Sequence, residues 1–328
     1  MERHTCSFTG IEGHERPLAI LKRAWQNDSL AHAYLFSGEE GIGKKTTALA
    51  LAAAINCLAG NEQGGCGTCP SCRKIMLQGH PDVHVVMPDG DEIKIDQIRQ
   101  IQSELSLKPF EGRKKILIVD SAESMNQAAS NAFLKTLEEP SGDSLIILIA
   151  ALPQKLLSTI RSRCQEIRFC ALSRSVLAQA LVQKKGLSKD DAEFLAALVQ
   201  GSMGRALATE CEEERKEREE FDRFWTGLHG CRPAEALAKA ESLAKDRERF
   251  ERLLDIGIER LRDALVFLLT RDKTLLVSSQ TNDRRDSGFF LQRILADLEL
   301  FFSSRKLLDR RVNGQLIAEN LFLKLCRE

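Results

Sequence analysis

The chain has 328 residues and carries 47 Lys and Arg against 47 Asp and Glu, so its formal net charge is zero. This balance excludes a protein that coats nucleic acid by itself, because phosphate binding requires clustered Lys and Arg. Hydrophobic residues make up 43% of the chain, which excludes a wholly disordered protein. A chain of this length is expected to fold as two or three domains of roughly 100 to 200 residues each.

The sequence shows neither a membrane span nor an export signal. The longest uncharged apolar run, residues 46–60, is shorter than the roughly 20 residues needed to cross a bilayer, and residues 1–18 lack the apolar centre of a signal peptide. The sequence therefore predicts a cytoplasmic protein without membrane contacts. In that compartment the ten cysteines are expected to be reduced thiols and not a disulfide framework.

Short apolar runs in the first half alternate with helical patterns, which is typical of a parallel sheet flanked by helices. The predicted strands are residues 33–36, 83–87, 116–119, 145–149 and 166–169. Helices are predicted after Lys44, where the sequence is rich in alanine, and over residues 127–139, where Pro140 ends the pattern. A further helix is expected to be capped by Asp96. Its apolar residues, spaced to share one face, are Ile98, Ile101 and Leu105.

Beyond about residue 170 the strand pattern disappears, and the rest of the chain is predicted to be helical. Residues 171–208 are predicted to form a small helical domain in which Gly201 and Gly204 break helices. Residues 212–222 carry mixed charge and are predicted to be a solvated helix or linker. An apolar stripe at helical spacing indicates core packing, and it comprises Leu254, Ile258, Leu261, Leu265 and Leu268. Residues 278–288 are predicted to be a polar loop, followed by two closing helices.

A glycine-rich segment has the setting of a phosphate-binding P-loop. Residues 37–46 read Ser-Gly-Glu-Glu-Gly-Ile-Gly-Lys-Lys-Thr, follow a predicted strand and open a predicted helix. Gly38, Gly41 and Gly43 let the backbone curl so that its N–H groups converge on phosphate oxygens, and the helix N-terminus adds partial positive charge. Lys44 supplies a positive charge to the outer phosphates of ATP or ADP. The alternative is a glycine-rich turn that binds nothing.

The loop departs from the P-loop pattern at the residue that should bind Mg²⁺. The position after Lys44 normally carries Ser or Thr, but here it holds Lys45, whose ammonium group cannot ligate a cation. Thr46 follows one residue later, and one step along a helix rotates a side chain by about 100°. Thr46 is kept as a candidate nucleotide-site residue, but it replaces the missing hydroxyl only if the loop shifts.

The acidic strand that would complete the metal site is also altered. Residues 115–120 end in Asp120, a carboxylate suited to Mg²⁺, but the next residue is Ser121 and not the glutamate that polarises the attacking water. Glu123 lies two positions further on and would need a different turn to approach. Hydrolysis is therefore not expected on two independent grounds, and we predict no intrinsic ATPase activity.

A cluster of cysteines, Cys57, Cys66, Cys69 and Cys72, lies among glycines and a proline that allow a tight loop. Four thiolates about 2.3 Å from one ion form a closed structural zinc site with no open position for catalysis. The alternative is a set of unliganded cysteines or a redox pair. His80 is expected to be a surface or turn residue and not a ligand. The remaining cysteines are expected to be packing residues: Cys6, Cys164, Cys170, Cys211, Cys231 and Cys326.

Four features of the sequence occur together. They are the P-loop followed by the four-cysteine module, Asn-Gln-Ala-Ala-Ser-Asn-Ala-Phe-Leu-Lys-Thr-Leu-Glu-Glu-Pro at 126–140, Thr-Ile-Arg-Ser-Arg-Cys at 159–164 and Gly-Ser-Met-Gly-Arg-Ala-Leu at 201–207. In this combination the chain resembles the AAA+ subunits of bacterial sliding-clamp loaders, and among them the delta-prime subunits of DNA polymerase III. The Leu-Glu-Glu-Pro and Ser-Arg-Cys pieces are specific in combination. The resemblance covers residues 30–207, and the C-terminal third is similar only in being helical.

The resemblance implies an α/β fold with three domains. Residues 1–170 would form an AAA+ P-loop-type parallel sheet domain with an inserted zinc module at 57–72. Residues 171–208 would form a helical lid, and residues 209–328 an all-α collar through which such subunits assemble.

The resemblance also implies roles for single residues. Arg163 matches the arginine that reaches across a subunit boundary toward ATP bound by the neighbour. Arg205 matches the second sensor arginine, which reads the γ-phosphate within its own subunit. Residues 150–153, Ala-Ala-Leu-Pro, lack the hydroxyl with which active relatives sense nucleotide.

Groups missing at three places favour a stator, a subunit that holds a ring together and donates Arg163 in trans without turning over ATP. The implied partners are the gamma/tau and delta subunits of a hetero-oligomeric ring, the sliding clamp and, through the complex, primer–template DNA. One alternative is an ATP-hydrolysing motor similar to the gamma/tau subunits, with Thr46 and Glu123 restoring the two altered motifs. Another is a zinc-bearing AAA+ relative outside replication.

Overall fold

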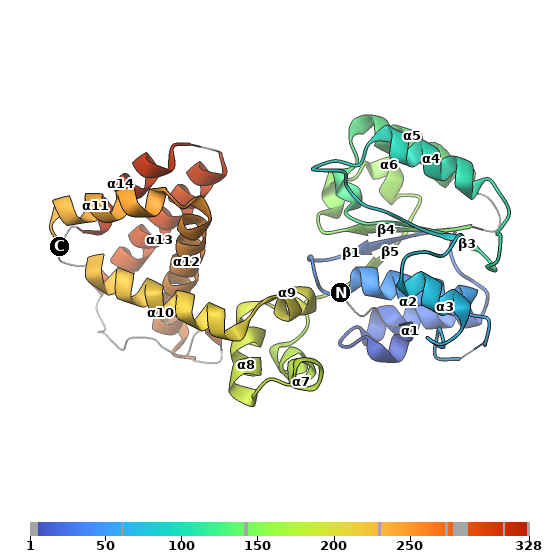
Figure 1. The fold of residues 1–328 in the computed structure, drawn as a ribbon, viewed down its shortest axis with the longest axis horizontal. Coiled ribbons are helices and arrows are strands. Elements are labelled where there is room, and N and C mark those ends of the chain that lie inside the picture. The colour runs from blue at the N-terminus through green and yellow to red at the C-terminus, as the bar shows by residue number, and fades with distance from the viewer. Residues whose placement is uncertain are drawn as a thin grey trace. The chain divides into compact units, whose positions relative to one another are not determined.

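The computed structural model describes residues 6–60, 62–140, 144–228, 231–272, 275–277, 288–310 and 312–326 (Figure 1). The chain divides into two compact units. The first unit consists of residues 1–192 and 199–208, and the second of residues 193–198 and 209–328. Each unit has its own apolar core.

The first unit is built on a parallel sheet with the strand order β2-β3-β4-β1-β5. The strands are β1 (Ala33–Ser37), β2 (Val83–Val86), β3 (Lys115–Val119), β4 (Ser144–Ala150) and β5 (Gln165–Arg168). Each lies within one residue of its predicted bounds, so the predicted parallel sheet is confirmed. The agreement follows from burial, because strands covered on both faces are continuous apolar runs that stand out in a sequence.

Helices cover both faces of the sheet (Figure 1). One face carries α1 (Glu15–Gln26), α2 (Lys44–Asn56) and α3 (Pro70–Met76), and the other carries α4 (Ile95–Leu105), α5 (Gln127–Glu138) and α6 (Ser158–Arg161). Successive side chains of β1 divide between the two cores: Tyr34 and Phe36 pack with α2, whereas Ala33 and Leu35 pack with α4 and α5. The result is a three-layer α/β arrangement that leaves the ends of the strands free to carry a site.

The predicted helix start at Asp96 was wrong by two residues. The N-cap of α4 is Lys94, and Asp96 lies inside the first turn, where a negative charge favours a helix N-terminus. The predicted apolar face is confirmed by the burial of Ile98 and Leu105. In α5, the side chain of Asn126 caps the helix by accepting a hydrogen bond of 2.9 Å from the N–H of Ala129.

A buried polar clamp holds the loop that leads into β3. Asp82 is fully buried and accepts hydrogen bonds from the backbone N–H groups of Phe110, Glu111 and Gly112 at 2.7, 2.9 and 2.7 Å. The Lys115 ammonium lies 3.4 Å from the same carboxylate. Burial alone would raise the pKa of Asp82, but these donors outweigh it and lower the pKa to about 2. Asp82 therefore stays ionised, and it fixes a loop that apolar packing alone would leave open.

Residues 171–208 are helical as predicted. They form α7 (Arg174–Lys185), α8 (Lys189–Leu198) and α9 (Met203–Ala208). Gly201 separates α8 from α9 with a φ of +86°, as a break should. The expectation for Gly204 was wrong, because this residue lies within α9, where it allows a close contact described below.

The second unit is all helical in the part that the structure describes. Besides residues 193–198 of α8, it contains α10 (Cys211–Leu228), α11 (Pro233–Ala244), α12 (Arg247–Thr270), α13 (Gly288–Asp309) and α14 (Gly314–Leu325). Leu254 and Leu261 of the predicted stripe are buried in its core. The two closing helices are confirmed, and the predicted polar loop lies outside the described residues except for Gly288.

The charged run at 212–222 differs from the solvated segment that was predicted. It lies within α10, but Glu214 and Arg218 are buried there and pair with each other at 2.9 Å. Glu259 and Arg252 on α12 pair with these two residues as well. The run therefore fastens α10 to α12 through charge pairs.

Among the described helices, none is both long and apolar enough to span a bilayer.

We predict that Asp82→Asn lowers the free energy of unfolding of the first unit by about 2–3 kcal/mol, because an amide cannot accept three N–H donors and leaves Lys115 without its counter-ion. Urea unfolding would be followed by the fluorescence of Trp25 in a Trp225→Phe background, which leaves one tryptophan in the chain. The exposed Asp91 supplies the control variant Asp91→Asn.

The pH dependence of this effect has a definite sign. The pKa of Asp82 is depressed in the folded protein, so its stabilising contribution is present above the unfolded value of about 3.9 and is lost as pH falls toward about 2. The difference between wild type and Asp82→Asn should be constant from pH 5 to pH 8 and shrink below pH 4. A difference that grew on acidification would contradict this account.

Candidate functional site

The glycine loop lies where β1 ends and α2 begins, at the carboxyl edge of the sheet. Gly38, Gly41 and Gly43 have φ angles of +142°, +74° and +107°, so the loop uses backbone conformations that side chains rarely allow. β1 lies between β4 and β5, and the neighbouring strands bring further residues to the same edge. In open parallel sheets this edge is where ligands bind.

A buried histidine that the sequence did not single out supports the loop. His14 Nε2 lies 2.6 Å from the carbonyl oxygen of Ile42, and the ring packs edge-on against Phe169. Burial lowers the pKa of His14, which favours a neutral ring that donates its Nε2 proton to the carbonyl. The sequence gives no signal for this role, because His14 is a lone histidine 28 residues before its partner.

Lys44 lies at the start of α2, as predicted for the phosphate-binding lysine. Its side chain folds back, and Nζ donates to the carbonyl oxygens of Gly38 and Glu39. Burial lowers the pKa of Lys44, and the negative charges of Glu123 and Asp120 oppose this effect. Lys44 is thus held inside the loop by groups of the loop itself.

Lys45 and Asp120 form an ion pair across the site. Lys45 Nζ lies 3.1 Å from Asp120 Oδ2, and each side chain is about one quarter exposed. The same ammonium lies 3.1 Å from the sulfur of Met87. Asp120 and Thr46 are candidate residues of the nucleotide site. In the structure the carboxylate of Asp120 is paired with Lys45.

Glu123 is engaged with the backbone at the end of β4. Its Oε1 accepts hydrogen bonds from the N–H groups of Ala151 and Leu152 at 2.7 and 3.1 Å. The turn that brings it there includes Ser121 in the left-handed region with a φ of +54°. Glu123 Oε2 is buried and has no hydrogen-bond partner within the described part of the chain. The carboxylate of Glu123 thus binds the backbone of residues 151–152, in the segment where active relatives are expected to carry a hydroxyl.

Helix α9 contacts the glycine loop directly. The N–H of Gly204 donates to the carbonyl oxygen of Gly41 at 2.8 Å, and Ser202 Oγ donates to the carbonyl oxygen of Glu40 at 3.2 Å. A Cβ atom on Gly41 would lie only 2.3 Å from Ser202 Oγ. Arg205, the predicted second sensor, follows Gly204 on α9 and is exposed. Its position beside this contact keeps it near the loop.

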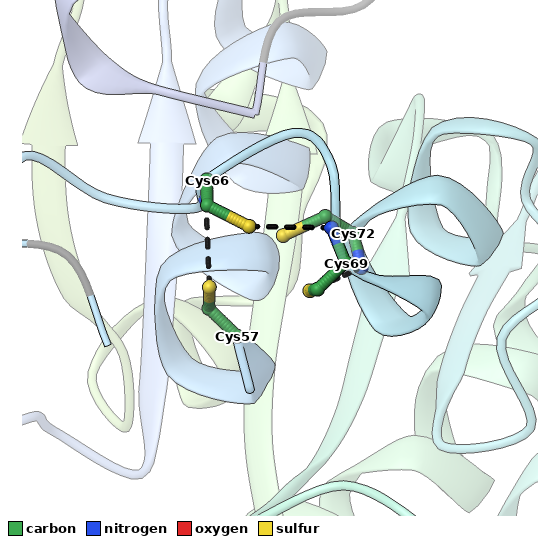
Figure 2. A group of neighbouring side chains, drawn as sticks. All are labelled: Cys57, Cys66, Cys69 and Cys72. Atoms are coloured by element: carbon green, nitrogen blue, oxygen red, sulfur yellow. Dashed lines mark hydrogen bonds between the residues drawn. The ribbon is translucent and has the colours of Figure 1, made fainter. Parts of the chain in front are cut away.

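The four predicted cysteine ligands converge on one point (Figure 2). Cys57 follows α2, Cys66 lies in the connecting loop, Cys69 caps α3 and Cys72 lies within α3. Their sulfur atoms all lie within 4.8 Å of one another. Four sulfurs around a tetrahedral zinc ion are about 3.8 Å apart, given Zn–S bonds of about 2.3 Å, so the donor set and spacing fit such an ion.

Hydrogen bonds to sulfur favour the thiolate form of Cys66, whereas burial raises the pKa of Cys72. The N–H groups of Cys66, Cys69 and Cys72 point at the sulfurs of Cys57, Cys66 and Cys69 respectively, at 3.3–3.4 Å. The hydroxyl of Thr68 and the N–H of Cys69 lower the pKa of Cys66 to about 6. A thiol with such a pKa is largely thiolate at neutral pH, which is the form that binds metals.

Two further residues lie near the module. Cys6 is buried in the core, as predicted for a packing residue, and its carbonyl oxygen accepts a hydrogen bond from the N–H of Gly65 while its thiol faces the carbonyl oxygen of Cys72. His80 is buried and not at the surface, and its Nε2 lies 3.1 Å from Ser71 Oγ. It lies outside the candidate metal-binding group, which in the described residues consists of the four cysteines.

Arg163 lies just after α6, with its side chain 37% exposed. Its guanidinium donates to the carbonyl oxygen of Thr159 at 3.1 Å and pairs with Glu138 at 2.8 Å. Glu138 belongs to the Leu-Glu-Glu-Pro piece and Arg163 to the Ser-Arg-Cys piece, which are 25 residues apart in sequence. The two specific pieces of the resemblance therefore meet in one ion pair.

A parallel sheet with a glycine loop after β1 and an aspartate after β3 is the arrangement of a P-loop domain. Residues 13–173 match the family model described as DNA polymerase III, delta subunit.

Relatives that align over most of the chain narrow this class to one family. The DNA polymerase III subunit delta' of Bacillus subtilis is 32% identical over 94% of this chain and 95% of its own length. The subunit of the same name from Pseudomonas aeruginosa is 37% identical over 55% of both chains. The DNA polymerase III subunit tau of Escherichia coli is 32% identical over 62% of this chain but only 32% of its own length. The chain belongs to the delta-prime family of DNA polymerase III subunits.

Proposed function

We propose that the chain is a stator subunit of a clamp loader: it does not hydrolyse ATP itself, and it donates Arg163 to ATP bound by the neighbouring subunit. In this role it helps to open the sliding clamp and load it on primed DNA during replication. The proposal rests on membership of the delta-prime family and on the placement of charged groups around the glycine loop.

The observation that carries the absence of hydrolysis is the engagement of Glu123. A general base has to face the attacking water, within hydrogen-bond reach of the proton that it removes. Here Glu123 Oε1 accepts two backbone N–H groups, and the negative charge of Glu123 offsets the burial of Lys44. Glu123 thus acts as a backbone clamp and counter-ion. This argues against a motor similar to the gamma/tau subunits, which needs Glu123 as a base.

The arginine donation is supported by chemistry and by exposure. A guanidinium placed against the transferred phosphoryl group offsets the charge that develops there, and an arginine supplied by another subunit makes that subunit's ATPase depend on assembly. The Arg163 side chain is exposed enough to reach a neighbouring subunit, and its partner Glu138 is 52% exposed. Exposed pairs of this kind are exchanged at small free-energy cost.

The expected assembly follows from the same proposal. The gamma/tau and delta subunits would be the neighbours in a hetero-oligomeric ring, with the sliding clamp and primer–template DNA bound through the complex. Residues 209–328 would form the collar that closes the ring, and residues 171–208 the lid over the glycine loop. The net charge of zero is consistent with DNA contacts made mainly through the complex.

We propose that the cysteine module binds a structural Zn²⁺ through Cys57, Cys66, Cys69 and Cys72. All four positions of a tetrahedral ion would be filled by sulfur, which leaves none for a substrate or water. The module joins the end of α2 to the start of α3. Its role would therefore be to stabilise the helix that begins at the glycine loop.

The first test is the ATPase activity of the isolated chain. We predict no steady-state phosphate release with Mg²⁺ and ATP above that of Lys44→Ala, because the hydroxyl that ligates Mg²⁺ is missing and Glu123 is engaged. Release of labelled phosphate from ATP radiolabelled at the γ position has the sensitivity required. Magnesium-dependent release that Lys44→Ala abolishes would falsify the stator proposal in favour of the motor.

The second test is Arg163→Ala in the reconstituted complex. An arginine finger raises kcat at its site by a factor of about 10³–10⁵. We therefore predict that the neighbouring site stops hydrolysing ATP, and that clamp-dependent ATP turnover of the complex falls by the contribution of that one site. Arg163→Lys should rescue little, because an ammonium lacks the planar fork. Arg161→Ala, an exposed arginine of the same segment, is the matched control. Unchanged turnover in a fully assembled Arg163→Ala complex would rule out donation in trans.

The third test concerns the metal. The purified chain should carry about one Zn²⁺ by mass spectrometry of the metal, and Cys69→Ser should lose most of it because one of four ligands is removed. Cys170→Ser, which removes an exposed thiol outside the cluster, should retain it. Loss of zinc should also lower the melting temperature, because metal binding is coupled to folding of the module. The zinc site would be refuted if the purified wild-type chain contained no metal and if its melting temperature did not change when Zn²⁺ was added.

A further inference from the structure

The Lys45 ammonium lies where a P-loop would hold its divalent cation. In such loops the residue after the phosphate-binding lysine and an aspartate after the neighbouring acidic strand direct oxygen ligands at Mg²⁺. Here the residue after Lys44 is Lys45, and its Nζ lies 3.1 Å from Asp120 Oδ2. The sulfur of Met87, 3.1 Å away, gives the ammonium a second, weak acceptor. A positive group of the chain itself therefore lies on the carboxylate.

The residues present do not fit Mg²⁺. This ion requires six oxygen ligands at about 2.1 Å in near-ideal octahedral geometry. Lys45 offers a cation in place of a hydroxyl, and Asp120 is already paired with it. Glu123, the other carboxylate near Lys44, uses one oxygen for the N–H groups of Ala151 and Leu152. A divalent ion would have to break the ion pair and then stand next to the displaced ammonium.

The same arrangement suits an anionic ligand. Lys44 and Lys45 are the first two residues of α2, and the carboxylates of Asp120 and Glu123 lie near them. An ammonium is a compact point charge with three donors, so Lys45 has protons for a phosphate oxygen in addition to Asp120. The N-terminus of α2 and the curled glycine loop add backbone N–H groups.

We propose that Lys45 is a tethered replacement for Mg²⁺, so that this loop binds a nucleoside polyphosphate in its metal-free form. The inference deepens the proposed function and rests on it, since a site without a divalent ion also lacks the Lewis acid that hydrolysis uses. It assigns the ligand class, and it states that added Mg²⁺ does not strengthen binding.

The test measures binding of N-methylanthraniloyl-ATP to the full chain by fluorescence anisotropy, in excess Mg²⁺ and in excess EDTA. For wild type we expect dissociation constants that agree within about twofold in the two buffers. Lys45→Thr restores the hydroxyl, and we expect it to bind at least about tenfold more tightly with Mg²⁺ than with EDTA. In Lys45→Thr/Asp120→Asn that preference should disappear, because the second metal ligand is gone.

A matched control and a check of folding complete the experiment. Lys22 of α1 is a helical, half-buried lysine like Lys45, and Lys22→Thr should behave as wild type in both buffers. Circular dichroism and melting temperature establish that each variant is folded before its binding is interpreted.

Each other outcome overturns the proposal. Wild-type binding that is tenfold tighter with Mg²⁺ would mean that the ion displaces Lys45. Wild-type chain that binds no nucleotide in either buffer would mean that Lys45 closes the site. A Lys45→Thr chain as insensitive to Mg²⁺ as wild type would mean that another group decides the metal dependence. None of these results bears on Arg163, so the stator proposal is tested separately, by the ATPase activity of the isolated chain and by turnover of the reconstituted complex.

Discussion

Charge neutralisation at the carboxyl edge of the sheet is the constraint on which the site depends. Two ammonium groups and two carboxylates gather around the glycine loop, and a partly buried charge is stable only when it is paired or hydrogen-bonded. The chain meets this requirement internally: Lys45 pairs with Asp120, Lys44 bonds to loop carbonyls, and Glu123 bonds to backbone N–H groups. The backbone shape of a P-loop is therefore retained, while its charged side chains pair with one another or bond to the backbone of the same chain.

Helix α2 connects this edge to the rest of the first unit, and it is fixed at both ends. At its start, His14 and the hydroxyl of Thr47 bond to the carbonyl oxygens of Ile42 and Gly43. At its end, Cys57 enters the cysteine module, and the side chain of Asn56 accepts from the loop before β3. A metal in the module would thus stabilise the same helix that positions Lys44 and Lys45. This gives a structural metal an influence on a site at the opposite end of the helix.

The sequence was sufficient for features that leave a local pattern. Strands buried on both faces appear as apolar runs, the glycine loop appears as spaced glycines, and the metal-binding group appears as cysteine spacing. Contacts between distant segments leave no such pattern. The bond between His14 and Ile42, the clamp of Glu123 on the end of β4 and the pairing of Arg163 with Glu138 all join residues at least 25 positions apart. Gly204 was mistaken for a helix break because close backbone packing and helix ending both favour glycine.

Two ion pairs of the first unit, Lys45 with Asp120 and Arg163 with Glu138, differ in their exposure to solvent. Lys45 and Asp120 are each about one quarter exposed, whereas Arg163 and Glu138 are 37% and 52% exposed. An exposed pair is worth about 0–1 kcal/mol, so in the proposed assembly Arg163 would leave Glu138 at little free-energy cost for a phosphoryl group bound by the neighbour. The more buried pair loses more when it is broken, because separation leaves two poorly solvated charges. The Lys45–Asp120 pair is therefore expected to persist, and the Arg163–Glu138 pair is the one that assembly into the proposed ring would break.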